Sequence, residues 1–212
     1  MKSYHQYCPI AVALDLVGER WSLLIVRELL EHGQQRYSDL HQNLEGCGTN
    51  ILAARLKELE RGGVVRRRRL PPPAASTVYE LTEYGLGLRP VLHQLAHWGA
   101  RAMGPPSADD LEPGWLAGAL QMSFPPGVDG RFEFRIGDEV ASLVDGAVIE
   151  GPAGRPDAVV RGDATCFYHL VVDRDLNAVT VDGSRAAVRR LLKALPPEAP
   201  ELMRPSVSPA AA

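Results

Sequence analysis

Four consecutive arginines, Arg66 to Arg69, form the strongest charge feature of the chain, and guanidinium groups are well suited to binding phosphate. From Arg36 to Leu70 the sequence carries 8 basic and 4 acidic residues, a local excess of four positive charges. Clustered positive charge is the electrostatic requirement for contact with a nucleic-acid backbone. An alternative is that the arginines only protect a solvated edge strand from aggregation.

The segment just before this run, residues 49–61, has the pattern of a helix that could read base edges. Leu52, Leu56 and Leu59 recur at helical spacing and predict an inward apolar stripe. The other face carries small and polar residues: Thr49, Asn50, Ala53, Ala54, Lys57 and Arg61, with Arg55 at the border. Asparagine can pair with adenine through two hydrogen bonds, so Asn50 is the candidate base contact. Its alternative role is that of an ordinary polar residue in a first helical turn.

The elements needed to hold this helix can be located on either side of it. Apolar residues at helical spacing predict helices over residues 10–17, 20–31 and 37–44, the last with Ser38 as its cap. A long helix is predicted from Thr82 to about Met103. Its apolar stripe is Leu88, Val91, Leu92, Leu95 and Trp98.

Between residues 61 and 82 the pattern is that of a β hairpin. The runs VVRRRRL and TVYELT flank the proline cluster Pro71 to Pro73, which predicts the tip. Alternation along the first strand sends Arg66 and Arg68 to one face and Arg67 and Arg69 to the other. Helices followed by such a hairpin are typical of a helix-turn-helix with a β wing. We assign Ser38, Arg67 and Arg69, together with the outer face of residues 49–61 and Arg55, to contact with double-stranded DNA.

Five motifs follow one another in a fixed order: Cys8-Pro9, GERW, RYSDL, LAARLKELE and YELTEYG. In this order and spacing, the segment from Cys8 to Met103 resembles the HxlR-type winged helix-turn-helix transcription regulators. The resemblance implies a homodimeric DNA-binding protein that acts on transcription, with residues 49–61 as the reader helix and the hairpin as the wing. Repression is the commoner action of this scaffold. The chain departs from the family in length, because a typical member ends soon after the long helix.

The resemblance gives Cys8 a second meaning. Some members use a cysteine at this position as a thiol sensor of oxidants or electrophiles. Reactivity requires an exposed and readily ionised thiol, and the alternative is an inert, partly buried cysteine. Cys47, between Gly46 and Gly48, is expected to pack in the turn before the reader helix.

The second half of the chain differs in charge and in pattern. The net charge of -3 divides into +3 through Met103 and -6 over the remainder, which suggests two modules. Period-two strands and two helices between residues 131 and 195 predict an α+β fold, and VDGAVIEG, DAVVRGD and NAVTVDG resemble the sterol-carrier-protein type 2-like fold. We therefore expect an α+β chain, with a mostly α winged domain at 1–104, a linker at 105–115, the sterol-carrier-like domain at 116–196 and a loose tail at 197–212.

The sterol-carrier resemblance implies an apolar tunnel or groove that holds a small apolar ligand. The candidate lining residues are Phe132, Phe134, Leu143, Phe167, Leu170, Val179, Leu191 and Leu192. Each could equally be a core residue, because apolar residues at structural periods usually pack against one another. Trp115, in the predicted linker, could dock the two domains.

Catalysis and metal binding receive little support. Cys166 and His169 lie three apart on a predicted helix near Asp163 and Asp173, but no nucleophile elbow, phosphate loop or HExxH motif accompanies them. His93 and His97, at i and i+4, lack a nearby third ligand and are expected at a dimer interface or on the surface. We predict no enzyme activity, no catalytic residue, no cofactor and no metal.

Three widely spaced cysteines, no membrane-length apolar run and no signal-peptide pattern predict a cytoplasmic protein that does not contact membranes. The function expected is a transcription regulator, a repressor, that binds a pseudo-palindromic operator as a homodimer and responds to a small apolar ligand. Residues 10–17 and the stripe around Leu92, Leu95 and Trp98 are the expected dimer surface. The alternative is a carrier or sensor of lipids or small molecules that uses the winged domain for dimerisation or protein partners.

Overall fold

The computed structural model describes residues 3–107 and 111–195 of the 212-residue chain. The chain forms two compact units, a first unit Met1–Leu92 and a second unit His93–Ala212, and each is described by itself. The predicted tail at 197–212 lies outside the described residues, as does part of the predicted linker. Within the described ranges, no helix has both the length and the apolar character needed to cross a membrane.

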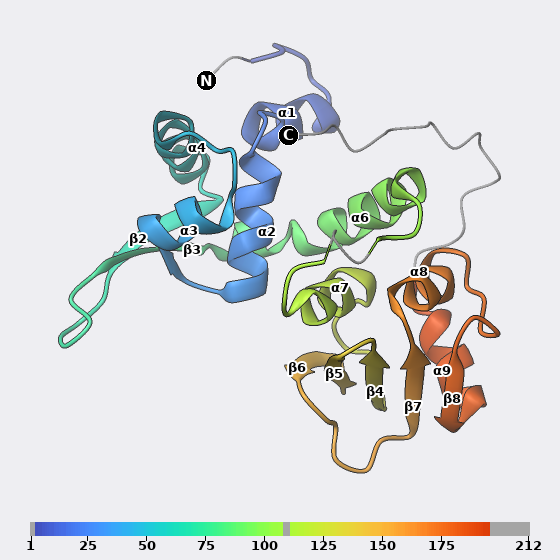
Figure 1. The fold of residues 1–212 in the computed structure, drawn as a ribbon. Coiled ribbons are helices and arrows are strands. Elements are labelled where there is room, and N and C mark those ends of the chain that lie inside the picture. The colour runs from blue at the N-terminus through green and yellow to red at the C-terminus, as the bar shows by residue number, and fades with distance from the viewer. Residues whose placement is uncertain (1–2, 108–110, 196–212) are drawn as a thin grey trace. The chain divides into compact units, whose positions relative to one another are not determined.

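The first unit consists of helices around a small antiparallel sheet (Figure 1). Its elements are α1 (Pro9–Val17), α2 (Ser22–His32), β1 (Gln35–Arg36), α3 (Tyr37–Asn43), α4 (Thr49–Arg61), β2 (Val65–Arg69), β3 (Thr77–Leu81), α5 (Glu83–Leu86) and the beginning of α6 (Arg89–Met103). The sheet order is β1-β3-β2. This arrangement confirms the winged helix-turn-helix prediction, and α4 has the predicted bounds.

The core of the first unit forms where α2, α3 and α4 meet. The buried stripe of α4 is Leu52, Leu56 and Leu59, as predicted from its spacing, and it packs in one cluster with Ile25 and Leu40. All five side chains are almost fully shielded from water. Because this stripe occupies one side of α4, the other side of the helix is left to face solvent.

Two local predictions for this unit are wrong. The helix predicted from Thr82 to Met103 is two helices, α5 and α6, because the chain turns at Gly87 and Pro90 then occupies the first turn of α6, where a missing N–H costs nothing. Thr82 caps only α5, its Oγ1 accepting from Gly85 N at 3.0 Å. Helix α3 begins at Tyr37 as predicted, but Ser38 is its second residue and does not cap it; Asp39 Oδ2 accepts from Arg36 N at 3.0 Å.

The second unit is a five-stranded sheet with three helices after α6. Its elements are α7 (Trp115–Ser123), β4 (Arg131–Ile136), β5 (Glu139–Val144), β6 (Ala147–Glu150), β7 (Ala158–Gly162), α8 (Ala164–Val172), β8 (Thr180–Gly183) and α9 (Arg185–Leu192). The strand order is β6-β5-β4-β7-β8, antiparallel except for the parallel pair β4 and β7. The predicted strands and the last two helices are all present, whereas α7 was not predicted.

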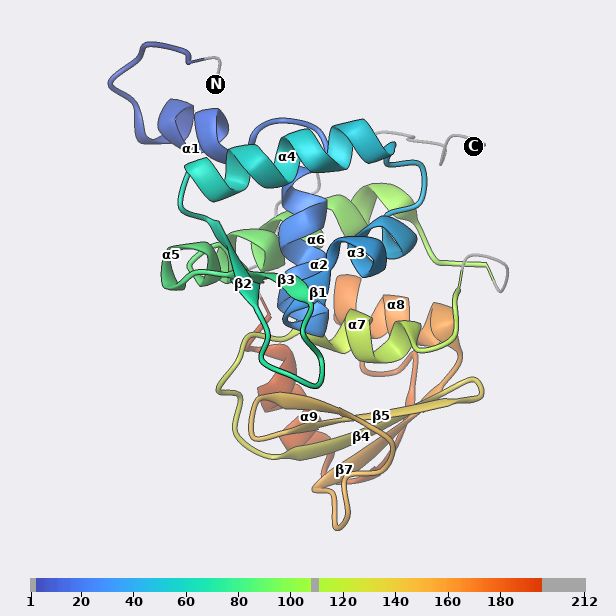
Figure 2. The same cartoon turned by 90° about the vertical axis from the view of Figure 1, so that its left-hand side faces the viewer.

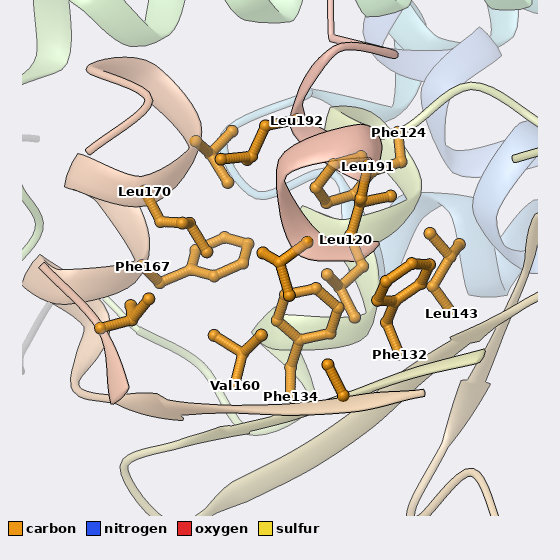
Figure 3. Close-up of a cluster of buried hydrophobic side chains, with 14 of the residues drawn as sticks. Leu120, Phe124, Phe132, Phe134, Leu143, Val160, Phe167, Leu170, Leu191 and Leu192 are labelled. Atoms are coloured by element: carbon orange, nitrogen blue, oxygen red, sulfur yellow. The ribbon is translucent and has the colours of Figure 1, made fainter. Parts of the chain in front are cut away.

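Helices α7, α8 and α9 cover one face of this sheet and enclose a continuous apolar core (Figure 3). All eight candidate ligand-lining side chains, from Phe132 to Leu192, are members of that core, and all are buried. Phe134 and Phe167 meet edge to face with ring centroids 6.0 Å apart. Trp115 is the first residue of α7, and its ring meets that of Phe167 edge to face with centroids 5.8 Å apart. It therefore packs inside the second unit instead of lying in a linker.

The division between the units falls within α6, before the boundary at residue 104 expected from the sequence. The second half of α6 bonds to the second unit: His97 Nε2 donates to the Ser123 carbonyl at 2.8 Å, and Tyr168 OH donates to the Ala100 carbonyl at 3.3 Å. Burial of the His97 ring lowers its pKa, although the Ser123 carbonyl favours the protonated form. His93 is buried and His97 is half-buried, so of the two positions expected for them the surface is wrong for His93, and a dimer interface stays a prediction.

Candidate nucleic-acid interface

The helix pair α3 and α4 is fixed in place by polar contacts at both ends of α3. Tyr37 OH donates to the Thr49 carbonyl at 2.7 Å, which ties the first residue of α3 to the first residue of α4. At the other end, Asn43 Nδ2 donates to Gln35 Oε1 at 3.1 Å. Gln35 is itself buried and donates to the Glu28 carbonyl at 2.9 Å. A network of side chains that are all hydrogen-bonded holds a single geometry. Because Gln35 bonds to Glu28 of α2, these contacts fix the start of α4 relative to α2.

The turn between α3 and α4 is short and tightly packed. Gly46 has φ of +76°, a conformation that side chains rarely adopt, and the edge of the Trp21 ring lies close to it. Cys47 is buried, as predicted, and burial raises the pKa of its thiol. Gly48 precedes α4 and supplies no side-chain cap, and its carbonyl accepts from Ile51 N at 2.9 Å. Among the described residues, the N–H groups of Thr49 and Asn50 form no hydrogen bond and remain available to an external acceptor.

Helix α4, seen along its length in Figure 2, exposes the residues expected from the sequence on its outer face. The exposed members of the predicted set are Thr49, Asn50, Ala53, Ala54, Lys57 and Arg61. Ile51 is also exposed, at 46%, and was not predicted as part of this face. The sequence could have indicated this exposure, because Ile51 is apolar but lies outside the leucine stripe. A branched apolar side chain on this face is suited to contact with a thymine methyl group.

Arg55 has a different environment from its neighbours on α4. Its Nη1 lies 2.6 Å from Glu58 Oε2 and 3.3 Å from Glu19 Oε2, and its side chain is only 17% exposed. Both contacts are intramolecular, and through Glu19 Arg55 connects α4 to the loop before α2. We therefore leave it out of the proposed DNA contacts.

The wing divides its four arginines between two environments. Strand register places Arg66 opposite Glu80, and Glu80 pairs with both arginines of that face, Arg66 Nε at 2.8 Å and Arg68 Nη2 at 3.0 Å. Arg68 also donates to Gln34. Burial raises the pKa of Glu80, but the hydrogen bonds from the two guanidinium groups outweigh it and the net shift is downward. One carboxylate thus partly neutralises this face.

Arg67 and Arg69 lie on the other face, opposite Tyr79 and Thr77. Both are exposed, and neither forms an ion pair with any carboxylate in the part of the chain that the structure describes. Two guanidinium groups that are free of internal partners retain their full charge for an external anion. The alternation predicted from the sequence is therefore accompanied by a difference in charge that the sequence did not reveal.

The other candidate residues differ in their local environments. Ser38 is exposed on α3 and donates to Asp39 Oδ1 at 3.0 Å. Cys8 is half-buried immediately before α1 and forms no disulfide. On α8, Asp163 accepts from Cys166 N at 2.7 Å, which lowers the pKa of Asp163, and His169 Nδ1 lies 2.6 Å from Asp173 Oδ2. Among residues 3–107 and 111–195, no group of three or more His, Cys, Asp or Glu side chains could hold a metal ion.

Comparison with known proteins identifies the first half of the chain. The sequence profile of the HxlR-like helix-turn-helix family matches residues 16–106. YvaP of Bacillus subtilis, named as an uncharacterized HTH-type transcriptional regulator, is 36% identical over 105 residues, which are 49% of this chain and 96% of YvaP. The HTH-type transcriptional regulator YodB of the same species is 33% identical over 92 residues, 43% of this chain and 87% of YodB.

A solved structure of YodB in its reduced form aligns with 48% of this chain and 100% of the YodB chain, at 32% identity and a TM-score of 0.41. The relatives YvaP and YodB are both named as transcriptional regulators. The family match ends at residue 106, so most of the second unit lies outside it.

Proposed function

The chain belongs to the HxlR-like helix-turn-helix family and is a DNA-binding transcriptional regulator, and from this premise we propose that it represses transcription by binding a pseudo-palindromic operator as a homodimer. A DNA-binding repressor acts in the compartment that holds its target promoter, so we propose that this protein is cytoplasmic. One observation carries the proposal: α4 has an exposed face of small and polar side chains, and the wing has two arginines, Arg67 and Arg69, that form no ion pair within the described part of the chain.

In the proposed complex α4 enters the major groove. Asn50 contacts a base edge, Ala53 and Ala54 allow the backbone to approach closely, and Lys57 and Arg61 contact phosphates. Thr49 lies at the start of α4, where its hydroxyl and the N–H groups of Thr49 and Asn50 suit a phosphate oxygen. Ser38 would contact the backbone from α3.

The wing supplies the remaining phosphate contacts. Arg67 and Arg69 face the duplex, while Arg66 and Arg68 remain with Glu80. Neutralising phosphates releases counterions, so binding should weaken steeply with salt.

Homodimerisation is supported by the apolar side chains that the described chain leaves in water. Ile10 is 71% exposed on α1 and Trp98 is 72% exposed on α6. Further exposed apolar residues on these two helices are Val12, Leu14, Val91 and Leu95. In the first unit, a hollow of about 300 Å³ is lined by apolar residues that include Leu16 of α1, Tyr84 of α5 and Leu88 just after α5. Apolar surface of this extent is typical of an interface, and a two-fold pair of reader helices would match half-sites one DNA turn apart.

For the second unit we propose a sterol-carrier-protein type 2-like fold whose core admits a small apolar ligand. Support comes from the strand order, a β6-β5-β4 meander extended by the parallel strand β7 and by β8, with helices on one face. The candidate lining residues are packed against one another, so a ligand would enter between side chains such as Phe132, Phe134 and Leu191 only as they separate. Ligand binding would then bias the dimer between two arrangements of its reader helices.

The experiment that tests the proposal is footprinting of purified full-length protein on the DNA upstream of its own gene, over a series of salt concentrations. The expected result is a protected site with two related half-sites and a dimer by native mass spectrometry. A dimer that gives no protected site even at low salt would favour the alternative of a carrier or sensor that uses the winged domain only for assembly. The same native spectrum reports whether an apolar molecule is bound.

Cys8 as a thiol sensor stays a prediction of the family resemblance. The half-buried position before α1, next to the proposed dimer surface, would let oxidation of the thiol disturb that surface. A mild oxidant should then reduce operator binding by the wild type and leave Cys8→Ser unaffected. Equal responses of the two proteins would show that Cys8 is inert.

A further inference from the structure

Helix α9 carries an unusually uniform outer surface. Its inner positions Ala187, Val188, Leu191 and Leu192 are buried in the core of the second unit. Between residues 185 and 193, four of the five exposed positions are cationic, namely Arg185, Arg189, Arg190 and Lys193, and the fifth is Ala186. No acidic residue occurs from residue 183 to residue 195. We call these four cations the α9 basic face.

Carboxylates near this helix in the sequence are already engaged elsewhere. Asp182 Oδ2 lies 2.7 Å from Arg161 Nε, and Asp175 Oδ1 accepts from Asn177 N at 2.8 Å. Within the described ranges, Arg189, Arg190 and Lys193 form no ion pair with a carboxylate. The α9 basic face therefore retains most of its charge.

The surrounding unit makes this concentration of charge more pronounced. Residues 93–212 contain 16 acidic and 11 basic residues, and four of those 11 are the α9 basic face. The unit is thus acidic overall with one cationic helix. Such a separation of charge orients a molecule as it approaches a polyanion, because the acidic remainder is repelled while the basic face is attracted.

The helix dipole does not explain the pattern. Cations in the last turn of a helix are stabilised by the dipole, which suits Arg189, Arg190 and Lys193. Arg185 is the first residue of α9, the end at which a positive charge is unfavourable. Its guanidinium bonds to the Leu176 carbonyl and to Asn177 Oδ1, both neutral groups that leave its charge uncompensated.

We propose that the α9 basic face binds the phosphate backbone of the same DNA that α4 reads, outside the two half-sites. The inference rests on the proposed function, since the first contact through α4 makes the second one intramolecular and raises its effective concentration. A second basic contact would lengthen the protected site and add to affinity without adding base specificity.

An anionic membrane is the other polyanion that a basic helix could bind, and the structure disfavours it. Helices that bind membrane surfaces insert an apolar face below the headgroups. The apolar face of α9 is occupied by the core of the second unit, with Val188 and Leu191 almost fully shielded from water. Apart from Ala186, only the charged side chains of α9 are exposed to a binding partner, and a phosphate backbone can be bound through charge alone.

The test compares wild type with Arg189→Gln, Arg190→Gln and the double variant, on operator DNA trimmed to the footprint and on the same DNA with flanks. Arg155→Gln, at an exposed loop position of the same unit, controls for the loss of net charge. We expect the salt dependence of log K on flanked DNA to become less steep by about 1 for each arginine removed. The trimmed DNA and the Arg155→Gln control should show no such change.

An unchanged slope in the double variant, or a change equal to that of Arg155→Gln, would overturn the inference. If the double variant lost binding to vesicles that contain phosphatidylserine while its DNA binding stayed unaltered, the inference would be overturned in favour of a membrane. A wild type with no protected site would instead count against the proposed function. In that case the slopes on random-sequence duplex still decide the role of α9.

Discussion

Helices α4 and α9 are built alike on the inside and differ on the outside. Each buries an apolar stripe, Leu52, Leu56 and Leu59 in α4 and Val188, Leu191 and Leu192 in α9, in the core of its own unit. The outer face of α4 mixes alanine, asparagine, threonine and lysine, whereas that of α9 is almost entirely cationic. Base reading requires small side chains and hydrogen-bonding groups at defined positions, while backbone binding requires only charge. The difference between the two faces is therefore a difference in the information that each can read.

The largest expected effect comes from the buried apolar stripe, a feature that both helices have. Leu56→Ala in α4 and Leu191→Ala in α9 each remove a buried side chain and should each cost about 2–5 kcal/mol of unfolding free energy. Because the two cores are separate clusters, the loss should be local. Hydrogen exchange read by mass spectrometry should rise in α2 and α4 for Leu56→Ala and in β4 and β7 for Leu191→Ala. Equal increases in both units for either variant would contradict the independence of the cores.

On the outside of α4, Asn50→Ala should remove one base contact. The expected loss is about 1–3 kcal/mol on the preferred operator, with relaxed preference at a single base position. Lys57→Ala on the same face is the matched variant, and it should weaken binding to all sequences equally. Affinities for a set of single-base operator variants measure both. If Lys57→Ala changed the preference and Asn50→Ala did not, the assignment of reader and backbone contacts would be reversed.

The two faces of strand β2 extend the comparison to the wing. Arg67→Ala should weaken DNA binding uniformly and reduce the salt slope by about 1, since Arg67 has no carboxylate partner among the described residues. Arg66→Ala removes the same charge from the neighbouring position, but Arg66 is paired with Glu80, so the slope should change less. Titrations of both variants at several salt concentrations test this. Indistinguishable slopes would show that the wing does not present one face to DNA.

The elements that the sequence predicted best are those with both a clear period and clear ends. Helix α4 was placed to the residue because a leucine stripe lies between Gly48 and Gly62. Helix α7 was missed because its short apolar run stands between proline- and glycine-rich segments that indicated only a linker. Strand β1 has two residues and exists only by pairing with β3, a contact more than 40 residues away that no local pattern reveals.

Site residues follow the same rule. Burial of Leu52 and exposure of Asn50 follow from helical period alone. Arg55 pairs with Glu58, three positions later on the same helix, and also with Glu19, which lies 36 positions earlier and meets it only in the folded chain. Glu80 pairs with Arg66 and Arg68, and not with Arg67 and Arg69, because of the register of the hairpin. The proline cluster at the tip did not allow that register to be predicted. Periodicity thus predicts which face a residue occupies, while tertiary contacts decide whether its charge is available.

The smallest expected effect concerns Glu80, whose pKa is lowered by hydrogen bonds from Arg66 and Arg68 against the opposing effect of burial. A carboxyl group with a depressed folded pKa stabilises the fold above its unfolded pKa of about 4.3, and this contribution disappears as pH falls through the lower folded value. Denaturant unfolding of the wild type should therefore show a small loss of stability below about pH 4.3 that Glu80→Gln lacks. Near neutral pH, Glu80→Gln should also free the charges of Arg66 and Arg68 and steepen the salt dependence of DNA binding. If the slope stays unchanged, the side of the wing that carries Glu80 is remote from DNA, and the separation of its two faces becomes sharper.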